Sequence, residues 1–579
     1  MLRPDCFRVT QKTRYIALYL LGFAALGLWH HLYFSYSVGE YVFFKNGYDE
    51  DTYVLFPFGP AGFRPDRMLS GVIVSAILWF SQESYNITLM VLDTLLPPLI
   101  FLAAYYAGAA LFAKFSTRSL FALVLIFATD LFSLGRVASY PGPFPTLNQF
   151  KALVGDAFVP PLETSYLGLY RSPEPQVSYV IGFLFIGLIL RIVLRDAEKT
   201  TQREVVKLSI VQMSLMLCYA LVSYPLVFVE GLAAIILLIS GRRQDAIILG
   251  VLFFGSIIAA FAFGWMTLGS SAGLLFSSRL PVVTVGVILA FALTIVFLYL
   301  LLRSGRADRW LMTGLAFSGM PLALTNQQLL TGLMVSAREW ERYVDLPFVV
   351  VAARILVSHA RWRLSWQIPA VALGTVVVVG FVLASSIRTY KLWLSDNLKT
   401  LAITRAVAGA DKNLTDDTLL VFDEPEYAPL VEARLGRPLH ALLNYTDVFK
   451  SPIPSTPGFS PTLLADALFE YSKQTAVTPA AAMEILQQEA RQRAGFYSGF
   501  IFNVCEYWYP CTDGRAVKTE KIVATLPSVV MSYTNFLAKP APPGKFAFVT
   551  SKSLPAPSKG EIISEGRATS IVARVSLRN

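Results

Sequence analysis

The chain of 579 residues is too apolar for an ordinary soluble protein, because 55% of its residues are hydrophobic and only 15% are charged, against roughly a quarter charged in soluble domains. Its apolar residues form long runs, which indicates a polytopic membrane protein. The net charge of +10 could suggest a nucleic-acid partner, but most of the cations flank apolar runs, as membrane anchors do. We therefore expect a membrane lipid as partner and no nucleic acid.

Apolar stretches of about 20 residues cross a bilayer as α-helices, and the chain contains about eleven of them. The predicted crossings are Tyr15–Leu32, Asn86–Phe112, Ser119–Gly135, Gln176–Leu194, Val206–Val222, Leu226–Ser240, Ala246–Leu268, Val282–Leu302, Trp310–Leu324, Tyr343–Val357 and Ile368–Ser386. The fifth and sixth are read as the two arms of a hairpin. We expect the arms to meet at Tyr224-Pro225, because proline breaks a helix.

Lysine and arginine clusters between the crossings predict the orientation of the chain. They include Arg3 to Arg14, Arg191 to Lys207 and Arg242-Arg243, and with eleven crossings they all fall on one side, which is expected to be cytoplasmic. A single crossing over Val206–Ser240 would divide them between the two sides. The prediction is a protein of the cytoplasmic (inner) membrane with a cytoplasmic N-terminus. The segments expected outside are 35–85, 136–175, 269–280, 326–342 and everything after Arg388.

Two segments outside the crossings have a recognisable pattern. Met68–Phe80, in the first outer loop (35–85), is apolar but too short to cross, which predicts an interfacial or re-entrant helix. After the membrane domain (1–390), the more polar residues 391–579 contain strand-like runs at Thr418–Phe422, Pro438–Leu443, Val523–Ser532 and Phe546–Ser551. This composition predicts an extracytoplasmic C-terminal domain of α/β or α+β type.

An acidic run, Asp49-Glu50-Asp51, lies in the first outer loop, and Arg64 and Arg67 follow it closely. Carboxylates can take a proton from a hydroxyl or hold a divalent cation. Guanidinium groups bind phosphate oxygens in fork geometry. The pattern is typical of a site that handles both a hydroxyl and a phosphate, although a solvated loop with a capping acid has the same composition.

An outward first loop with adjacent acids, then a short interfacial helix and a bundle of ten or more crossings, resembles the GT-C superfamily of integral-membrane glycosyltransferases. The resemblance covers Tyr15 to about Ser386 and extends to the C-terminal domain. It implies that Asp49, Glu50 and Asp51 act as catalytic base, or bind the acceptor or a divalent cation (Mg²⁺ or Mn²⁺). It also implies a polyprenyl-phosphate-linked sugar as donor and a glycan, lipid or protein as acceptor.

Two further polar groups lie in predicted outer segments. The amides of Asn326, Gln327 and Gln328 suit hydrogen bonds to sugar hydroxyls, and Trp340 could stack on a sugar ring; helix capping and interfacial anchoring are the alternatives. Arg171 precedes the fourth crossing and could bind a lipid-linked phosphate or form an exposed ion pair with Glu174. The candidate phosphate-binding and substrate-binding residues are thus Arg64, Arg67, Arg171, Asn326, Gln327, Gln328, Arg338 and Arg342.

Asp93, Asp130 and Glu230 lie inside predicted crossings, where ionisable groups are usually functional or bonded to another helix. The four histidines are scattered and predict no histidine-based metal site. Cys505 and Cys511 lie close together in the C-terminal region and are candidates for a disulfide if that region faces an oxidising compartment.

The sequence therefore favours an enzyme that transfers a sugar from a polyprenyl-phosphate carrier to an acceptor on the outer face of the membrane. A transporter or flippase for a lipid-linked or anionic substrate is the alternative, with the intramembrane acids as proton or ion relays. A catalytically inactive scaffold of the same fold is the third reading.

Overall fold

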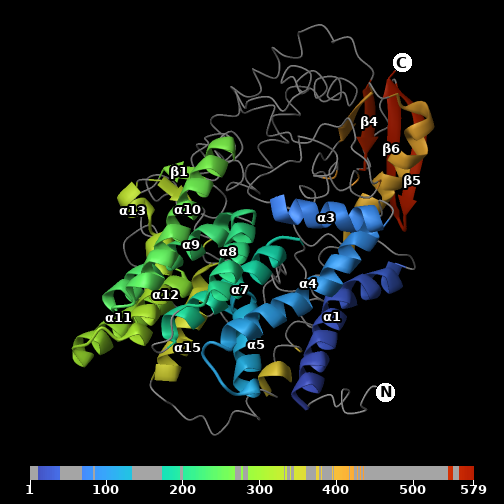
Figure 1. Cartoon of the computed structure of the whole chain (residues 1–579). Helices are drawn as coiled ribbons and strands as arrows, with labels where there is room; N and C mark the ends of the chain where they lie inside the picture. Colours follow the sequence, from blue (N-terminus) through green and yellow to red (C-terminus); the bar gives the residue numbers. More distant parts are fainter. Residues whose placement is uncertain are drawn as a thin grey trace, which may run out of the picture.

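In the computed structural model the chain forms a bundle of helices and a small C-terminal sheet (Figure 1). A few isolated residues are described besides the continuous segments. These segments are 11–38, 68–81, 85–132, 173–195, 200–218, 220–267, 275–277, 284–331, 333–335, 344–359, 373–376, 394–395, 397–415, 418–422, 546–551 and 560–578.

The long helices lie close to the predicted crossings. Their bounds are α1 Gln11–Val38, α4 Tyr85–Gly108, α5 Phe115–Phe132, α7 Gln176–Leu194, α8 Gln202–Met216, α9 Ala220–Ile239, α10 Arg243–Thr267, α11 Val285–Ser304, α12 Arg309–Thr325 and α15 Leu346–His359. Six of them (α1, α4, α7, α9, α10 and α11) contain a stretch long and apolar enough to cross a membrane. The prediction of a mostly helical protein with several apolar helices that could cross a membrane is confirmed, whereas the predicted number of eleven crossings is not.

Contacts between helices fix their relative directions. α1 runs antiparallel to α4, because Tyr19 stacks on Phe101 near one end and His31 bonds Asp93 near the other. α11 runs antiparallel to α12, since Thr294 bonds Ser318 while Phe297 lies against Gly314. Other helix contacts, such as Gly187 of α7 beside Ala107 of α4 and Gly182 beside Val222 of α9, extend the pattern. From α1 to α15, successive long helices alternate in direction through the bundle.

The predicted hairpin exists, but its break was misplaced. The chain leaves α8 at Leu217, whose N–H bonds the carbonyl oxygen of Ser214, and enters α9 at Ala220. Pro225 lies inside α9. It is only the sixth residue of that helix, so its missing N–H removes a single bond near the N-terminus, and the helix tolerates it.

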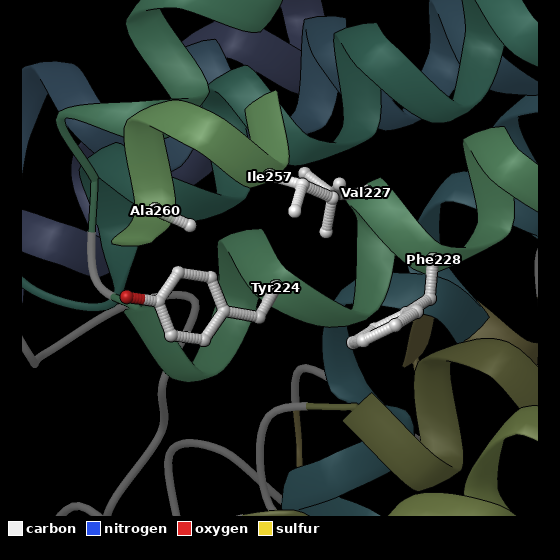
Figure 2. A pocket seen from close by; sticks show the side chains of 5 residues that line it. All are labelled: Tyr224, Val227, Phe228, Ile257 and Ala260. Carbon is white, nitrogen blue, oxygen red and sulfur yellow. The ribbon is translucent and has the colours of Figure 1, made fainter. Parts of the chain in front are cut away.

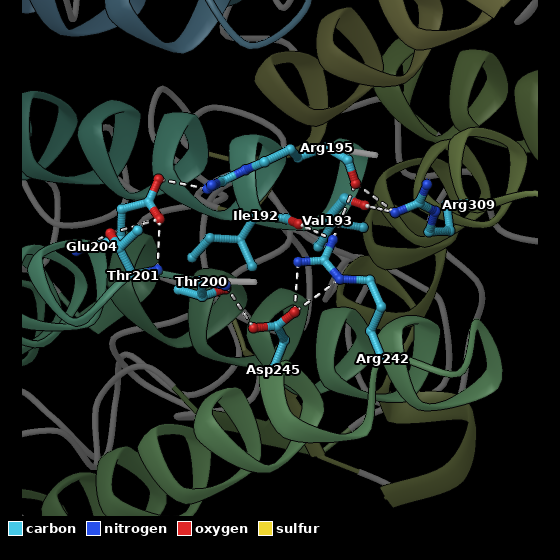
Figure 3. A network of polar contacts seen from close by, with 9 residues as sticks. All are labelled: Ile192, Val193, Arg195, Thr200, Thr201, Glu204, Arg242, Asp245 and Arg309. Carbon is cyan, nitrogen blue, oxygen red and sulfur yellow. Dashed lines mark hydrogen bonds and ion pairs between the residues drawn. The ribbon is translucent and has the colours of Figure 1, made fainter. Parts of the chain in front are cut away.

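One end of the bundle, which we call the arginine end, is held together by Arg195, Arg242 and Arg309. Arg242 donates to the carbonyl oxygen of Ile192 at 2.7 Å, and Arg309 donates to that of Arg195 at 2.6 Å (Figure 3). These bonds satisfy carbonyls that a helix C-terminus leaves without partners, here at the end of α7. Arg242 also pairs with Asp245 in the first turn of α10. The contacts join α7, α10 and α12.

The short helix α3 (Met68–Phe80) has the predicted bounds and lies across the opposite end of the bundle, which we call the α3 end (Figure 1). At its start, the N–H of Leu69 donates to the carbonyl oxygen of Leu217 at 2.9 Å. Just past its end, the Ser81 hydroxyl bonds that of Thr88 at 3.0 Å. Because Leu217 and Thr88 both lie at helix ends on the same face, α3 crosses that face and does not enter the bundle.

The C-terminal sheet has the strand order β3-β4-β6-β5, with β3 and β4 parallel and the other neighbours antiparallel. Strands β3 (Leu419–Phe422) and β4 (Phe546–Thr550) confirm two of the four strand predictions, and the other two, Pro438–Leu443 and Val523–Ser532, lie outside the described residues. Strands β5 (Gly560–Ala568) and β6 (Ile571–Arg578) were not predicted. A helix over 397–410 packs on β5 at Gly566, where an added Cβ would meet the carbonyl oxygen of Ala402. One apolar cluster joins this domain to α3 and the start of α4.

Candidate functional site at the α3 end

A buried carboxyl group ties α3 to the bundle. The hydroxyls of Ser70 in α3 and Ser178 in α7 each donate to one oxygen of Glu174, which is 5% exposed. The Cys218 thiol, at the end of α8, lies beside Glu174 and Ser178. Glu174 is thus buried between two hydroxyl donors and is not the exposed acid that the sequence suggested. Arg171, its possible ion-pair partner, lies outside the described residues, so that pairing stays a prediction.

A second buried pair lies between α1 and α4. His31 Nε2 and Asp93 Oδ2 are 2.7 Å apart, and the two residues are 1% and 4% exposed. The carboxylate orients the ring and holds its tautomer, an arrangement that also serves catalytic histidines. Sequence reasoning singled out Asp93 but dismissed the histidines as scattered, since nothing local links two residues 62 positions apart.

Gln176, in the first turn of α7, is a further polar residue that the sequence did not reveal. It is completely buried, and neither polar atom of its amide has a hydrogen-bond partner among the described residues. A buried polar group without a bond costs about 1–3 kcal/mol, so such groups in proteins usually serve a purpose. With Glu174 two residues away, Gln176 gives the α3 end a polar interior.

The predicted amide run begins at the C-terminus of α12, also at the α3 end. Asn326 caps that helix, and Gln328, in the four-residue helix α13 (Gln328–Thr331), is completely buried. Asp345 accepts a bond from Thr325 at 2.6 Å, which joins α12 to the start of α15. Strands β1 (Leu275–Ser277) and β2 (Leu333–Val335) pair, so these parts of two predicted outer segments lie side by side.

Trp340 does not suit the role of a sugar platform. It is 4% exposed and belongs to the main hydrophobic core, in the same cluster as Val344 and Phe348. Its charged neighbours in the sequence favoured an interfacial anchor as the alternative, but the Trp340 side chain is buried in the hydrophobic core.

Of the other intramembrane acids, Glu230 lies about halfway along α9 and is completely buried. The Gln212 amide donates to it and to Ser256 Oγ, so one polar cluster links α8, α9 and α10. Asp130 lies in the last turn of α5, and its side chain is outside the described part of the chain.

Several predicted site residues lie outside the described residues, and the structure does not test them. They are Asp49, Glu50, Asp51, Arg64, Arg67, Arg171, Arg338, Arg342, Cys505 and Cys511. Among the residues that are described, no three His, Cys, Asp or Glu side chains come together in a way that could hold a metal ion. The acidic run remains the candidate for a divalent cation.

An apolar cavity of about 220 Å³ lies between α9 and α10, away from these polar groups. Tyr224, Val227, Phe228, Ile257 and Ala260 line it (Figure 2). Its lining suits hydrocarbon and offers little to a sugar or a phosphate.

Comparison with protein-family models and with curated proteins finds no match to this chain. Its function must therefore be inferred from the chemistry and the placement of its own residues.

Proposed function

We propose that this protein is a membrane glycosyltransferase of the GT-C type, which moves a sugar from a polyprenyl-phosphate carrier to an acceptor at the α3 end. The observation that carries the proposal is the position of α3 across the ends of α4, α7 and α8. In the chain, α3 directly follows the loop that bears Asp49, Glu50 and Asp51. We expect the acidic loop to lie at the surface of the bundle, because α3 follows it there. At that position its carboxylates could contact both a donor carried by a membrane lipid and an acceptor in water.

The proposed topology has eleven crossings, with the arginine end in the cytoplasm and the α3 end outside. The alternating directions of the long helices support it, together with the position of Arg195, Arg242 and Arg309 at one end. The eleventh crossing, Ile368–Ser386, would bring the chain to the outer side. The C-terminal domain would follow there, where the apolar cluster shared with α3 and α4 suits it to present the acceptor.

In the proposed reaction, Asp49 or Asp51 accepts the proton of an acceptor hydroxyl, or orients that hydroxyl, as its oxygen attacks the anomeric carbon. The bond from that carbon to the phosphate oxygen breaks, and the phosphate leaves on its lipid. Arg64, Arg67, Arg171 or Arg342 stabilises the departing negative charge. A divalent cation held by the acidic run would supply further charge stabilisation.

The test is sugar transfer by the purified protein, with labelled polyprenyl-phosphate sugars and candidate acceptors. Single changes of Asp49, Glu50 and Asp51 to alanine should include one that lowers turnover at least about 100-fold, the effect of removing a general base. Melting temperature checks the fold of each variant. Glu561→Ala is the matched control, because Glu561 is an exposed acid on β5. Full transfer by all three loop variants contradicts the proposal.

A transporter or flippase is the second candidate, and the buried cluster of Glu230, Gln212 and Ser256 favours it, because ionisable groups at that depth often serve ion or proton relays. In reconstituted vesicles, Glu230→Gln would then abolish movement of the lipid-linked substrate. The enzyme proposal instead expects that variant to retain its transfer activity in detergent.

A further inference from the structure

Two arginines meet at one phenylalanine at the arginine end of the bundle. Arg354 of α15 lies over the Phe112 ring, with its guanidinium carbon 3.4 Å from the ring centroid. Arg118 of α5 donates from Nε to the carbonyl oxygen of the same Phe112 at 2.6 Å. Phe112 belongs to the turn between α4 and α5, so both arginines contact this turn, one at the ring and the other at the carbonyl oxygen.

The same face of α15 carries two polar atoms without partners. Nε of Arg354 and Oγ of Ser358, one helical turn apart, are buried and make no hydrogen bond with the described residues. A helical serine commonly bonds the carbonyl four residues earlier, as Ser209 and Ser240 do here. The Ser358 hydroxyl and the Arg354 guanidinium are thus two donors on the same face of α15.

No carboxylate balances these cations in the described part of the chain. Neither Arg118 nor Arg354 forms an ion pair there. Asp308 approaches the neighbouring His359, at 3.8 Å, and its Oδ1 accepts bonds from the N–H groups of Trp310 and Leu311. An anion at this place would supply the charged partner that both guanidinium groups lack within the described residues.

The surroundings are those of a membrane surface. Tyr105 lies under Arg118 and close to Phe115, and Arg191 lies over Tyr106 at the end of α7. Aromatic rings and arginines together mark the level of lipid headgroups. Further cations, Arg361 and Arg363, follow α15 within a few residues of the sequence. Basic pockets between helix ends on a cytoplasmic face bind anionic headgroups.

We propose that Arg118, Arg354 and Ser358 form a binding site for the phosphate of an anionic phospholipid headgroup at the arginine end. The Ser358 hydroxyl and Arg354 Nε donate to phosphate oxygens, and the remaining N–H groups of Arg118 donate from the opposite side. The acyl chains lie along the apolar surface of the bundle. This site is distinct from the α3 end and does not depend on the reaction proposed there.

The test uses the full chain, purified in detergent and stripped of lipid, with dioleoyl phosphatidylglycerol as probe and dioleoyl phosphatidylcholine as the uncharged comparison. Phosphatidylglycerol should raise the melting temperature and remain bound in native mass spectrometry, whereas phosphatidylcholine should do neither to the same extent. Arg354→Gln and Arg118→Gln should each weaken the apparent affinity about tenfold or more, as the loss of a charge-assisted bond does. Arg303→Gln, an exposed arginine at the same end, should change nothing.

Ser358→Ala separates a lipid site from a structural role. The hydroxyl has no partner in the part of the chain that the structure describes, so the variant should melt as the wild type does without lipid and should gain less from phosphatidylglycerol. Equal gains from both lipids, or unchanged affinity in Arg354→Gln and Ser358→Ala, would overturn the proposal. A gain from millimolar inorganic phosphate that matches the lipid effect would overturn the assignment to a phospholipid and favour a free phosphate.

Discussion

The contact between α1 and α4 depends on single residues that let two backbones approach. A Cβ added to Gly27 would lie 1.8 Å from the carbonyl oxygen of Asp93, whereas Gly22 on the same helix has nothing within 4 Å. The close approach brings His31 within hydrogen-bond distance of Asp93. Small residues serve this purpose widely in membrane helices, since packing drives their association.

We therefore expect Gly27→Ala to lower the stability of the bundle by about 2–3 kcal/mol, because α1 must move away from α4. Gly22→Ala should be neutral or slightly stabilising, since alanine favours helix. Thermal unfolding of the two variants in the same detergent measures the difference. Equal melting temperatures would show that α1 and α4 do not approach so closely.

At the residue level, the sequence identified some individual groups but not their partners. Asp93 and Glu230 stood out because an acid in an apolar run is costly. Their partners His31 and Gln212, and the serines around Glu174, look ordinary in sequence, because only tertiary packing brings them together. Gln176 gave no signal at all, since a glutamine at a helix start is expected in water.

Among the elements, α8 has a well-defined start. Thr201 and Glu204 form a capping box, and Arg195 bonds the Glu204 carboxylate (Figure 3). Burial alone would raise the pKa of Glu204, but the hydrogen bonds from Thr201 and Arg195 outweigh it, and the pKa lies below its ordinary value of 4.5. The ionised form is therefore the one that stabilises this helix end.

Because the folded protein holds the pKa of Glu204 low, the stabilisation is complete above pH 4.5 and is lost as the pH falls through the folded value. Glu204→Gln should melt below the wild type at pH 7, by an amount equivalent to about 1 kcal/mol. The difference should shrink as the pH is lowered below 4.5. Melting curves across this range test the prediction, and a difference independent of pH contradicts it. The exposed Glu561→Gln is the control.

The end of α7 makes a second prediction about an element. Arg242 bonds Asp245 and two carbonyls of that helix end, those of Ile192 and Arg195. Arg242→Ala leaves a largely buried aspartate and two carbonyls without these bonds, so we expect a loss of about 2–4 kcal/mol. The adjacent Arg243 is exposed, and Arg243→Ala should have almost no effect. Equal effects in thermal unfolding would contradict the role given to Arg242.

Helices were easier to predict than strands, for a physical reason. An apolar run of fixed length is a strong local signal, and α3 and α7 have the bounds read from the sequence. The break between α8 and α9 was misplaced, because Pro225 is tolerated near a helix start. Strands β5 and β6 alternate charged and apolar residues on a partly exposed sheet, a weaker pattern than that of a fully buried strand.

For the whole molecule, the long helices alternate in direction, the cations of Arg195, Arg242 and Arg309 collect at one end, and α3 closes the other. The rule that lysine and arginine collect on the cytoplasmic side of a membrane predicted, from sequence, both the alternation of the helices and the gathering of cations at one end. The chemistry of the candidate site was anticipated less well. The acids that carry the proposed function lie in a loop outside the described residues, and loops owe little of their shape to local pattern.

The arrangement predicts on which side of the membrane each end lies. In a bacterial host, a fusion of green fluorescent protein after Arg243, the first residue of α10, should fluoresce, because positively charged ends remain in the cytoplasm. Alkaline phosphatase fused after Asn579 should be active, since the sheet belongs with α3 on the opposite face. Reporters on the same side would contradict the alternation of helices. If the site in α10 proved to be outside and Asn579 inside, the acidic loop would lie in the cytoplasm. The acceptor of the proposed reaction would then have to be cytosolic.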